Sequence, residues 1–287
     1  MSSPLALLQT LQRPSLLRST VAVRRRHHRS HPTAVRPSLH FPNNALKYWD
    51  NFYRRHQDKF FKDRHYLEKD WGQYFSGDIG SSNGKKIVLE VGCGAGNTIF
   101  PLLASFPELY IHACDLSPHA IKLLKSHADH KETQVNAFVC DVTEEDLCDR
   151  LAPSSVDIVT LIFMLSAVLP SEMPKILQNI RGVLKPDGCV LFRDYAFGDF
   201  AQVKLKEKDR MITENFYVRG DGTCSFYFTE DFLSNLFLGA GFFTADMSIY
   251  QKQIENRLKN VTMDRCWIRG IFTKQDCRLP DSVLASK

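Results

Sequence analysis

Three glycines at alternate positions, Gly92, Gly94 and Gly96, follow an apolar run that ends near Glu90. Glycine lacks a Cβ atom and tolerates positive φ, so a turn built from it lets a ligand approach backbone N–H groups closely. A helical pattern starts directly after the turn, and the unpaired N–H groups at a helix N-terminus favour a carboxylate or a phosphate. The three glycines therefore predict a binding site for an anionic group against the backbone.

The spacing of the glycines bears on which ligand is bound. A dinucleotide prefers G-x-G-x-x-G, with the third glycine three positions after the second. Asn97 occupies that place here, and the third glycine comes one position early, at Gly96. A tight turn without a ligand also needs such glycines, so the triplet alone decides little.

Two acidic residues strengthen the case for a nucleoside ligand. Asp115 ends the apolar run 109–115, and a carboxylate at that strand end can accept hydrogen bonds from both ribose hydroxyls. Asp141 follows the next apolar run and can accept the adenine amino group, while Val142 packs against the ring. A single acid after a strand is more often a turn or helix cap, but acids at the ends of successive strands favour a shared site.

The elements that must position these residues alternate between strand and helix from Lys85 onward. Strands are predicted at 86–91, 109–115, 134–141, 156–165 and 189–195, with helices to about Ala104, at 117–125 and at 172–184. This alternation predicts a doubly wound α/β sheet, whose ligands gather at the carboxyl ends of the strands.

The pattern changes after Tyr195. Two aromatic strands around residues 220–222 predict a β-hairpin insertion within 214–229. A helix at 230–241 and two more strands, at 242–250 and 265–274, follow. We expect a mostly parallel sheet whose last strand is antiparallel.

The chain is predicted to divide into four parts. These are a basic segment at 1–41, an aromatic helical segment at 42–84, the sheet domain at 85–275 and a tail at 276–287. Residues 1–49 carry seven Arg, one Lys and no acid. That composition is typical of an organelle transit peptide and predicts a mitochondrion or a plastid. The alternative is a disordered basic arm that binds nucleic acid in the cytoplasm.

The glycine turn with its strand-end acids resembles the class I methyltransferases, which use S-adenosylmethionine, over roughly residues 85–200. The resemblance implies a Rossmann-like fold in which the glycine turn carries the methionine part of the cofactor. It also implies that the apolar LIF at 161–163 closes the far side of the adenine, with Ile162 closest. The implied cofactor-binding residues of the sheet domain are Gly92, Gly94, Asp115, Asp141, Val142 and Ile162.

Longer segments resemble the eukaryotic tRNA N3-methylcytidine methyltransferases of the methyltransferase-like group. They are YWDNFYRRHQDKFFKDRHYLEKDW at 48–71, LIFMLSAV at 161–168, LFRDY at 191–195 and ENFYVRGDGT at 214–223. The match runs from about Ala45 to Lys274. It implies methylation of N3 of a cytidine in the tRNA anticodon loop, most often position 32, with Trp49 and Tyr53 folded back over the cofactor.

An anticodon loop is single-stranded RNA, which proteins hold by stacking bases on aromatic rings and by pairing Arg or Lys with phosphates. The residues predicted to make these contacts are Phe60, Phe61, Lys62, Arg64, Arg193, Tyr217 and Arg219. For the aromatic residues of 214–229 the alternative is an ordinary hairpin core, since aromatic side chains favour strands.

The chemistry of cytosine suggests which residues act on it. Its neutral N3 has a free lone pair that can attack a sulfonium methyl group, so alignment is the main requirement once the base is turned out. A carboxylate near N3 and N4 would stabilise the resulting positive charge, and Asp194 is predicted to supply it. Arg64 is predicted to hold the O2 edge or a flanking phosphate. The alternative for Asp194 is a structural pair with Arg193 or a turn cap.

Other functions are compatible with parts of this pattern. A class I methyltransferase for a small molecule or a protein would use the same glycine turn, and a non-catalytic RNA-binding subunit would not need it intact. No Cys/His grouping has zinc spacing, and no apolar run reaches the ~18 residues that cross a bilayer. The resemblance leaves open which tRNA is used and whether a helper, such as an aminoacyl-tRNA synthetase, takes part.

Overall fold

The computed structural model describes residues 39–76, 85–256 and 261–274. All of them belong to one of the two units into which the chain divides, Arg36–Lys287. Most of the basic segment predicted at 1–41, the end of the helical segment at 77–84 and the tail at 276–287 therefore lie outside the described residues.

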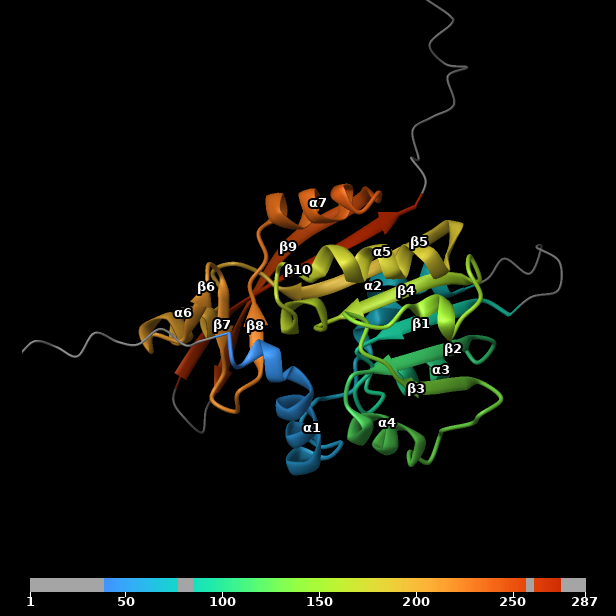
Figure 1. Cartoon of the computed structure of the whole chain (residues 1–287), viewed down its shortest axis with the longest axis horizontal. Helices are drawn as coiled ribbons and strands as arrows, with labels where there is room; N and C mark the ends of the chain where they lie inside the picture. The colour runs from blue at the N-terminus through green and yellow to red at the C-terminus, as the bar shows by residue number, and fades with distance from the viewer. Residues whose placement is uncertain (1–38, 77–84, 257–260, 275–287) are drawn as a thin grey trace, which may run out of the picture. The chain divides into compact units, whose positions relative to one another are not determined.

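Seven strands form the main sheet, in the order β3-β2-β1-β4-β5-β10-β9 (Figure 1). They are β1 (Ile87–Val91), β2 (Tyr110–Asp115), β3 (Val135–Val139), β4 (Val156–Ile162), β5 (Leu184–Tyr195), β9 (Phe243–Asn256) and β10 (Val261–Thr273). The first five pair in parallel, and β10 pairs antiparallel with β5 and with β9. The mostly parallel doubly wound sheet is confirmed, and its strand order reverses between β1 and β4.

Two hydrophobic clusters cover the two faces of this sheet, because successive residues of a strand point to opposite sides. Val88 belongs to one cluster and Leu89 to the other. One face carries α2 (Tyr66–Phe75), α3 (Ile99–Ser105) and α4 (Pro118–Lys125), and the other carries α5 (Met173–Val183) and α7 (Glu230–Gly239). The helices α4 and α5 confirm the two helices predicted at 117–125 and 172–184.

The aromatic N-terminal segment, predicted to be helical, forms two helices, α1 (Ala45–His56) and α2. Gln57 ends α1 with φ 54° and ψ −139°, which lie outside the helical region. Phe60 therefore lies in the loop that joins α1 to α2. None of the helices in the described part of the chain is both long and apolar enough to cross a membrane.

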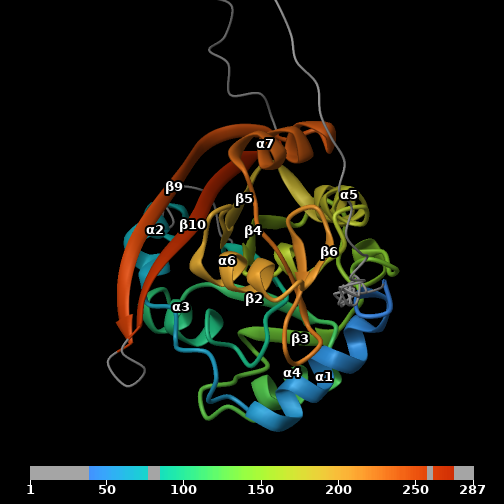
Figure 2. The same cartoon turned by 90° about the vertical axis from the view of Figure 1, so that its left-hand side faces the viewer.

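The predicted hairpin insertion is present and is larger than expected. After α6 (Phe200–Glu207), β6 (Met211–Thr213), β7 (Phe216–Val218) and β8 (Cys224–Phe226) form a small antiparallel sheet. The turn between β7 and β8 contains Gly222 at φ 90°, and a Cβ atom there would overlap the ring of Tyr48. This contact joins the insertion to α1, which lies beside it in both views (Figures 1 and 2).

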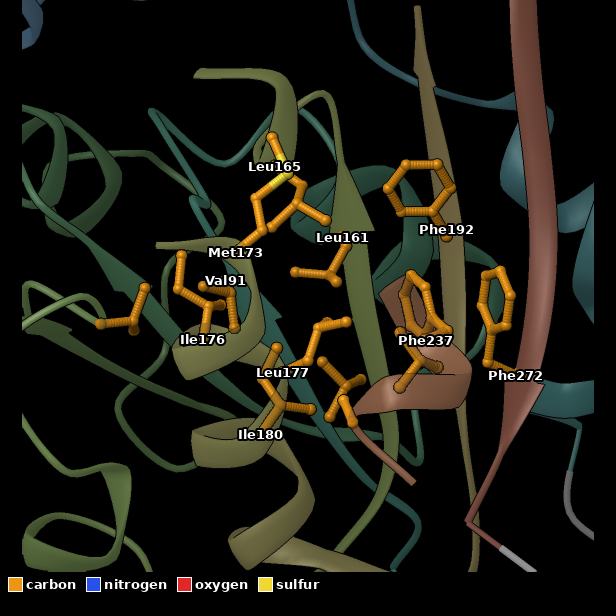
Figure 3. Packing of buried hydrophobic residues seen from close by; sticks show 14 of the residues in the cluster. Val91, Leu161, Leu165, Met173, Ile176, Leu177, Ile180, Phe192, Phe237 and Phe272 are labelled. Carbon is orange, nitrogen blue, oxygen red and sulfur yellow. The ribbon is translucent and has the colours of Figure 1, made fainter. Parts of the chain in front are cut away.

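Aromatic rings fill the core beneath α7 (Figure 3). The rings of Phe237 and Phe272 stack with centroids 3.6 Å apart and an interplanar angle of 9°. Phe192 packs edge-on against both, at 5.9 and 6.4 Å. All three side chains are fully buried, so they join α7 to the centre of the sheet.

We predict that Phe237→Ala lowers the free energy of unfolding by about 3–5 kcal/mol, since it leaves a cavity beside a stacked partner. Leu238→Ala is the matched control, because Leu238 is the next residue of α7 and is 58% exposed. Its effect should stay within about 0.5 kcal/mol. Urea denaturation measures both variants, and equal losses would contradict the packing described for this face.

Candidate active site

The carboxyl ends of β1, β2 and β4, with the residues that follow β3, surround a cavity of about 810 Å³, and α1 forms the opposite wall. Of the residues predicted to bind the cofactor, six line this cavity: Trp49, Tyr53, Gly92, Asp115, Asp141 and Val142. Gly94 lies beneath the Tyr53 hydroxyl, and Ile162 lines a second, smaller cavity. The strand-end residues that the sequence singled out are thus brought together at the switch point.

The glycine turn needs glycine for two reasons. Gly92, Gly94 and Gly96 have φ of 73°, 55° and 95°, which side chains other than glycine rarely adopt. A Cβ atom on Gly94 would also lie 2.5 Å from the hydroxyl oxygen of Tyr53. Glycine at position 94 therefore lets the Tyr53 side chain of α1 pack directly on the turn.

Asp115 links this turn to the next helix. Its Oδ2 accepts a hydrogen bond from Gly94 N at 2.9 Å, and its Oδ1 accepts one from Ser117 N at 2.8 Å. Burial raises the pKa of Asp115 to about 6, and the two hydrogen bonds act in the opposite direction. Each carboxylate oxygen keeps a second lone pair for a ligand hydroxyl.

Asp141 caps a turn and also lines the large cavity. Its Oδ1 accepts hydrogen bonds from Thr143 N at 3.0 Å and Thr143 Oγ1 at 2.6 Å, which is a turn cap. The same residue lines the large cavity beside Val142. The cap holds the carboxylate at the cavity wall.

Helix α1 is attached over the cavity by Asp50. The carboxylate Oδ1 of Asp50 accepts hydrogen bonds from Ser117 Oγ at 2.9 Å and His119 N at 3.1 Å, at the start of α4. Arg54 Nε pairs with the other oxygen at 2.9 Å. Tyr53, only 6% exposed, is thereby held above the glycine turn.

The smaller cavity, about 30 Å³, lies against the large one. The two share the wall residues Trp49, Tyr53, Gly92, Phe163 and Ala167. The smaller cavity alone is lined by Phe61, Arg64, Ile162, Ser166, Tyr195 and Arg219. Three residues predicted to contact RNA therefore meet at its wall: Phe61, Arg64 and Arg219.

Arg64 is an interior residue. Its Nη1 donates hydrogen bonds to Thr98 Oγ1 at 3.0 Å and to Ile162 O at 3.2 Å, and its side chain is 14% exposed. The same nitrogen lies 4.0 Å from Glu90 Oε1, a buried oxygen with no hydrogen-bond partner. In this position Arg64 lines the smaller cavity, and its contact with the O2 edge or a flanking phosphate stays a prediction.

Asp194 stands behind the wall of the smaller cavity. It is fully buried and lines neither cavity. Its oxygens accept hydrogen bonds from Ser166 N at 2.9 Å and Tyr195 N at 2.8 Å, and both of these residues line the smaller cavity. Burial raises the pKa of Asp194 to about 6. Its contact with a substrate base stays a prediction.

Two residues predicted to contact RNA are placed elsewhere. Arg193 pairs with Asp70 at 2.7 Å and lies between the rings of Tyr66 and Tyr250, so its proposed pairing with Asp194 is wrong. Neighbouring residues of a strand point to opposite faces, which separates Arg193 from Asp194. Tyr217 is 2% exposed and packs in the insertion, which corresponds to the hairpin-core alternative.

Phe60 and Lys62 remain at the surface, and Phe60 is 54% exposed. Phe163, predicted only as part of the apolar LIF beside the adenine, also lines the smaller cavity, and two further residues of that cavity were not predicted: Ser166 and Tyr195. Ser166 lies four positions after the last residue of β4, at the switch point, and the rule that ligands gather there is the signal that points to it. Within the described ranges, no three His, Cys, Asp or Glu side chains are grouped to hold a metal ion.

The switch-point cavity, its glycine turn and its strand-end acids define a class I, S-adenosylmethionine-dependent methyltransferase. A family profile described as "Methyltransferase domain" matches residues 89–190. The fold is similar to that of a Burkholderia thailandensis structure, 1,6-didemethyltoxoflavin-N1-methyltransferase with bound S-adenosylhomocysteine. The TM-score is 0.53 at 19% identity, over 85% of this chain and 93% of that chain.

Relatives of higher sequence identity are named as enzymes that methylate N3 of cytidine in tRNA. The tRNA N(3)-cytidine methyltransferase METTL6 of Homo sapiens is 41% identical over 230 residues, which is 80% of each chain. The tRNA N(3)-methylcytidine methyltransferase trm141 of Schizosaccharomyces pombe is 38% identical over 237 residues, 82% of this chain and 94% of the relative. The chain belongs to the tRNA N3-cytidine methyltransferase family.

Glu90 provides a pH-dependent test of this site. Burial raises its pKa in the folded protein to about 7 from an ordinary 4.5, so the folded state holds the proton more tightly than the unfolded chain. The stability that Glu90 contributes is full below about pH 4.5 and is lost as the pH rises toward 7. Between pH 5 and pH 8 the wild type should therefore lose roughly 2–3 kcal/mol relative to Glu90→Gln.

Urea denaturation of both proteins at the two pH values measures this loss. Glu132→Gln, which changes an exposed carboxyl group, is the control and should follow the wild type. A difference between wild type and Glu90→Gln that does not change with pH would mean that Glu90 titrates as an ordinary carboxyl group.

Proposed function

We propose that this protein transfers a methyl group from S-adenosylmethionine to N3 of a cytidine in the anticodon loop of a tRNA. The main support is the pair of adjoining cavities, one large and bounded by the glycine turn, the other small and lined by Arg64, Tyr195 and Arg219. Direct transfer of a methyl group requires that the two reactants bind in adjoining sites. The acceptor, N3 of a cytidine in tRNA, is inferred from the names of the family's relatives.

The large cavity suits S-adenosylmethionine. Gly92 of the glycine turn lines it, Asp115 offers lone pairs to ribose hydroxyls, and Val142 offers an apolar surface to the adenine. When bound, the cofactor supplies an electrophilic methyl group on a sulfonium ion. The protein aligns and encloses it, with Trp49 and Tyr53 excluding water from the side of α1.

The smaller cavity must open to admit a base. Its volume of about 30 Å³ is close to the share of a single water in the liquid, far less than a pyrimidine ring requires. The loop that carries Phe61, and the side chains of Tyr195 and Arg219, are the walls that can separate. Phe60 and Lys62 lie in the same loop and are exposed. An exposed aromatic ring beside an exposed cation favours a large, anionic and aromatic acceptor such as RNA over a small molecule.

Two groups would act on the cytosine once it enters. Arg64 lines the smaller cavity and would hold the O2 edge. Asp194 carries negative charge close behind the wall, where low solvent access strengthens its interaction with the positive charge of the methylated base. Deprotonation of N4 would require Ser166 or Tyr195 to shift away from the carboxylate, and Asp194 would then accept that proton.

Single-turnover methylation of an anticodon stem-loop tests the function. We expect a stem-loop with cytidine at the target position to be methylated, because its N3 has a free lone pair. The same loop with uridine, whose N3 carries a proton at neutral pH, should remain unmodified. Digestion and mass spectrometry identify the product, and equal methylation of the two loops would exclude a cytidine-N3 enzyme.

Asp194→Asn separates chemistry from binding. The variant keeps the size of the side chain and removes the charge, so kcat should fall about 10²-fold or more while the affinities for cofactor and stem-loop stay nearly unchanged. Asp187→Asn, at an exposed position near the start of β5, is the control. Thermal denaturation checks that the buried substitution leaves the protein folded. A folded variant with the wild-type rate would place the catalytic carboxylate elsewhere.

A further inference from the structure

Phe163 has an unusual backbone conformation at the centre of the site. Its φ is 57°, a left-handed value that is rare for a bulky side chain, and it directly follows the last residue of β4. Its N–H donates to Arg193 O at 2.8 Å, and the preceding carbonyl, Ile162 O, accepts from Arg64. These bonds hold the chain in a conformation that persists only where the surroundings impose it, and such residues collect at functional sites.

The ring of Phe163 lies in the wall that both cavities share. It is half-buried, and its centroid lies 4.9 Å from the ring of Tyr195, at an interplanar angle of 47°. The guanidinium carbon of Arg64 lies 5.5 Å from the same ring. Phe163 therefore contacts two residues of the smaller cavity while its ring also borders the larger one.

The aromatic residues of α1 and of the loop after it that line these cavities pack against other neighbours. Tyr53 is pressed onto Gly94, and Trp49 packs with Phe52 on the side of α1. Phe61 lines only the smaller of the two cavities, and it packs against Phe60 and Phe52. Among the five residues of the shared wall, Phe163 is the aromatic one whose ring packs against Tyr195 on the acceptor side.

We infer that Phe163 is the platform on which the acceptor base stacks, and that it sets the base edge toward the large cavity. The inference rests on the proposed function. A flipped pyrimidine entering beside Tyr195 and Arg64 would place one face on the Phe163 ring, and base–aromatic stacking holds any base without reading its edge. Phe163 then supplies affinity and alignment, and the choice of cytidine is left to the polar groups around it.

The test compares a stem-loop carrying cytidine at the target position with one that is abasic there. Wild type should bind the cytidine loop more tightly than the abasic loop. Phe163→Leu should lose about 10- to 100-fold in affinity for the cytidine loop and nothing for the abasic loop, with a matching loss in kcat/KM. Phe163→Tyr keeps the ring and should behave as wild type. Phe197→Leu, at an exposed ring outside both cavities, is the control.

Phe163→Gly guards against a purely structural effect, because it removes the ring and accommodates the positive φ. A loss shared by the Leu and Gly variants, with cofactor affinity within about threefold of wild type, supports the platform. A Leu variant that distinguishes the two loops as well as wild type does would overturn it, as would a loss confined to cofactor binding. If wild type methylates neither loop, the proposed function fails and the platform fails with it. If wild type methylates the cytidine loop, only the platform is at stake.

Discussion

The buried carboxylate of Asp115 holds the cofactor side of this protein together. One oxygen accepts from Gly94 N in the turn after β1, and the other accepts from Ser117 N at the start of α4. The Ser117 hydroxyl in turn donates to Asp50 of α1, which places the N-terminal helix over the cavity. A chain of three polar contacts thus connects the sheet, a helix start and the covering helix. Because the carboxylate is buried, each of these contacts works in a medium that weakens it little.

Three carboxyl groups, Glu90, Asp115 and Asp194, are buried along the carboxyl edge of the sheet, and burial raises the pKa of each, to about 7, 6 and 6. Concentrating acids in this way costs stability, because their ionised forms lose hydration. The proposed reaction accounts for the arrangement. With the sulfonium ion in the large cavity and a positively charged base forming in the smaller one, negative charge at this edge would favour both.

The N-terminal helix α1 with its following loop, and the insertion, are additions to the sheet domain, and they meet beside the smaller cavity. Tyr48 of α1 fits against Gly222 of the insertion, and the loop after α1 carries Phe61 and Arg64 to the smaller cavity. The insertion contributes Arg219 to the same wall. If the smaller cavity opens for the base as proposed, both additions to the fold take part, because each of them contributes residues to its wall.

The sequence by itself determined the doubly wound, mostly parallel class of the sheet, the glycine turn and the acids at the strand ends. These features are local, since periodicity and turn chemistry act over a few residues and parallel strands bring their ends to one edge. The resemblance of long segments added the family. The same local reasoning could not place Arg193, whose partner Asp70 lies 123 positions away, or foresee that Tyr217 is buried within the insertion.

Only the tertiary structure decided how the side chains at that edge are used. It turned Arg64 inward to Thr98 and Ile162, and it set Asp194 behind the wall that Ser166 and Tyr195 form. It also forced Phe163 into a left-handed conformation between two cavities. Each of these outcomes depends on hydrogen bonds and ring contacts between segments far apart in the chain. No spacing in the sequence encodes them, because they exist only when the packed elements bring both partners together.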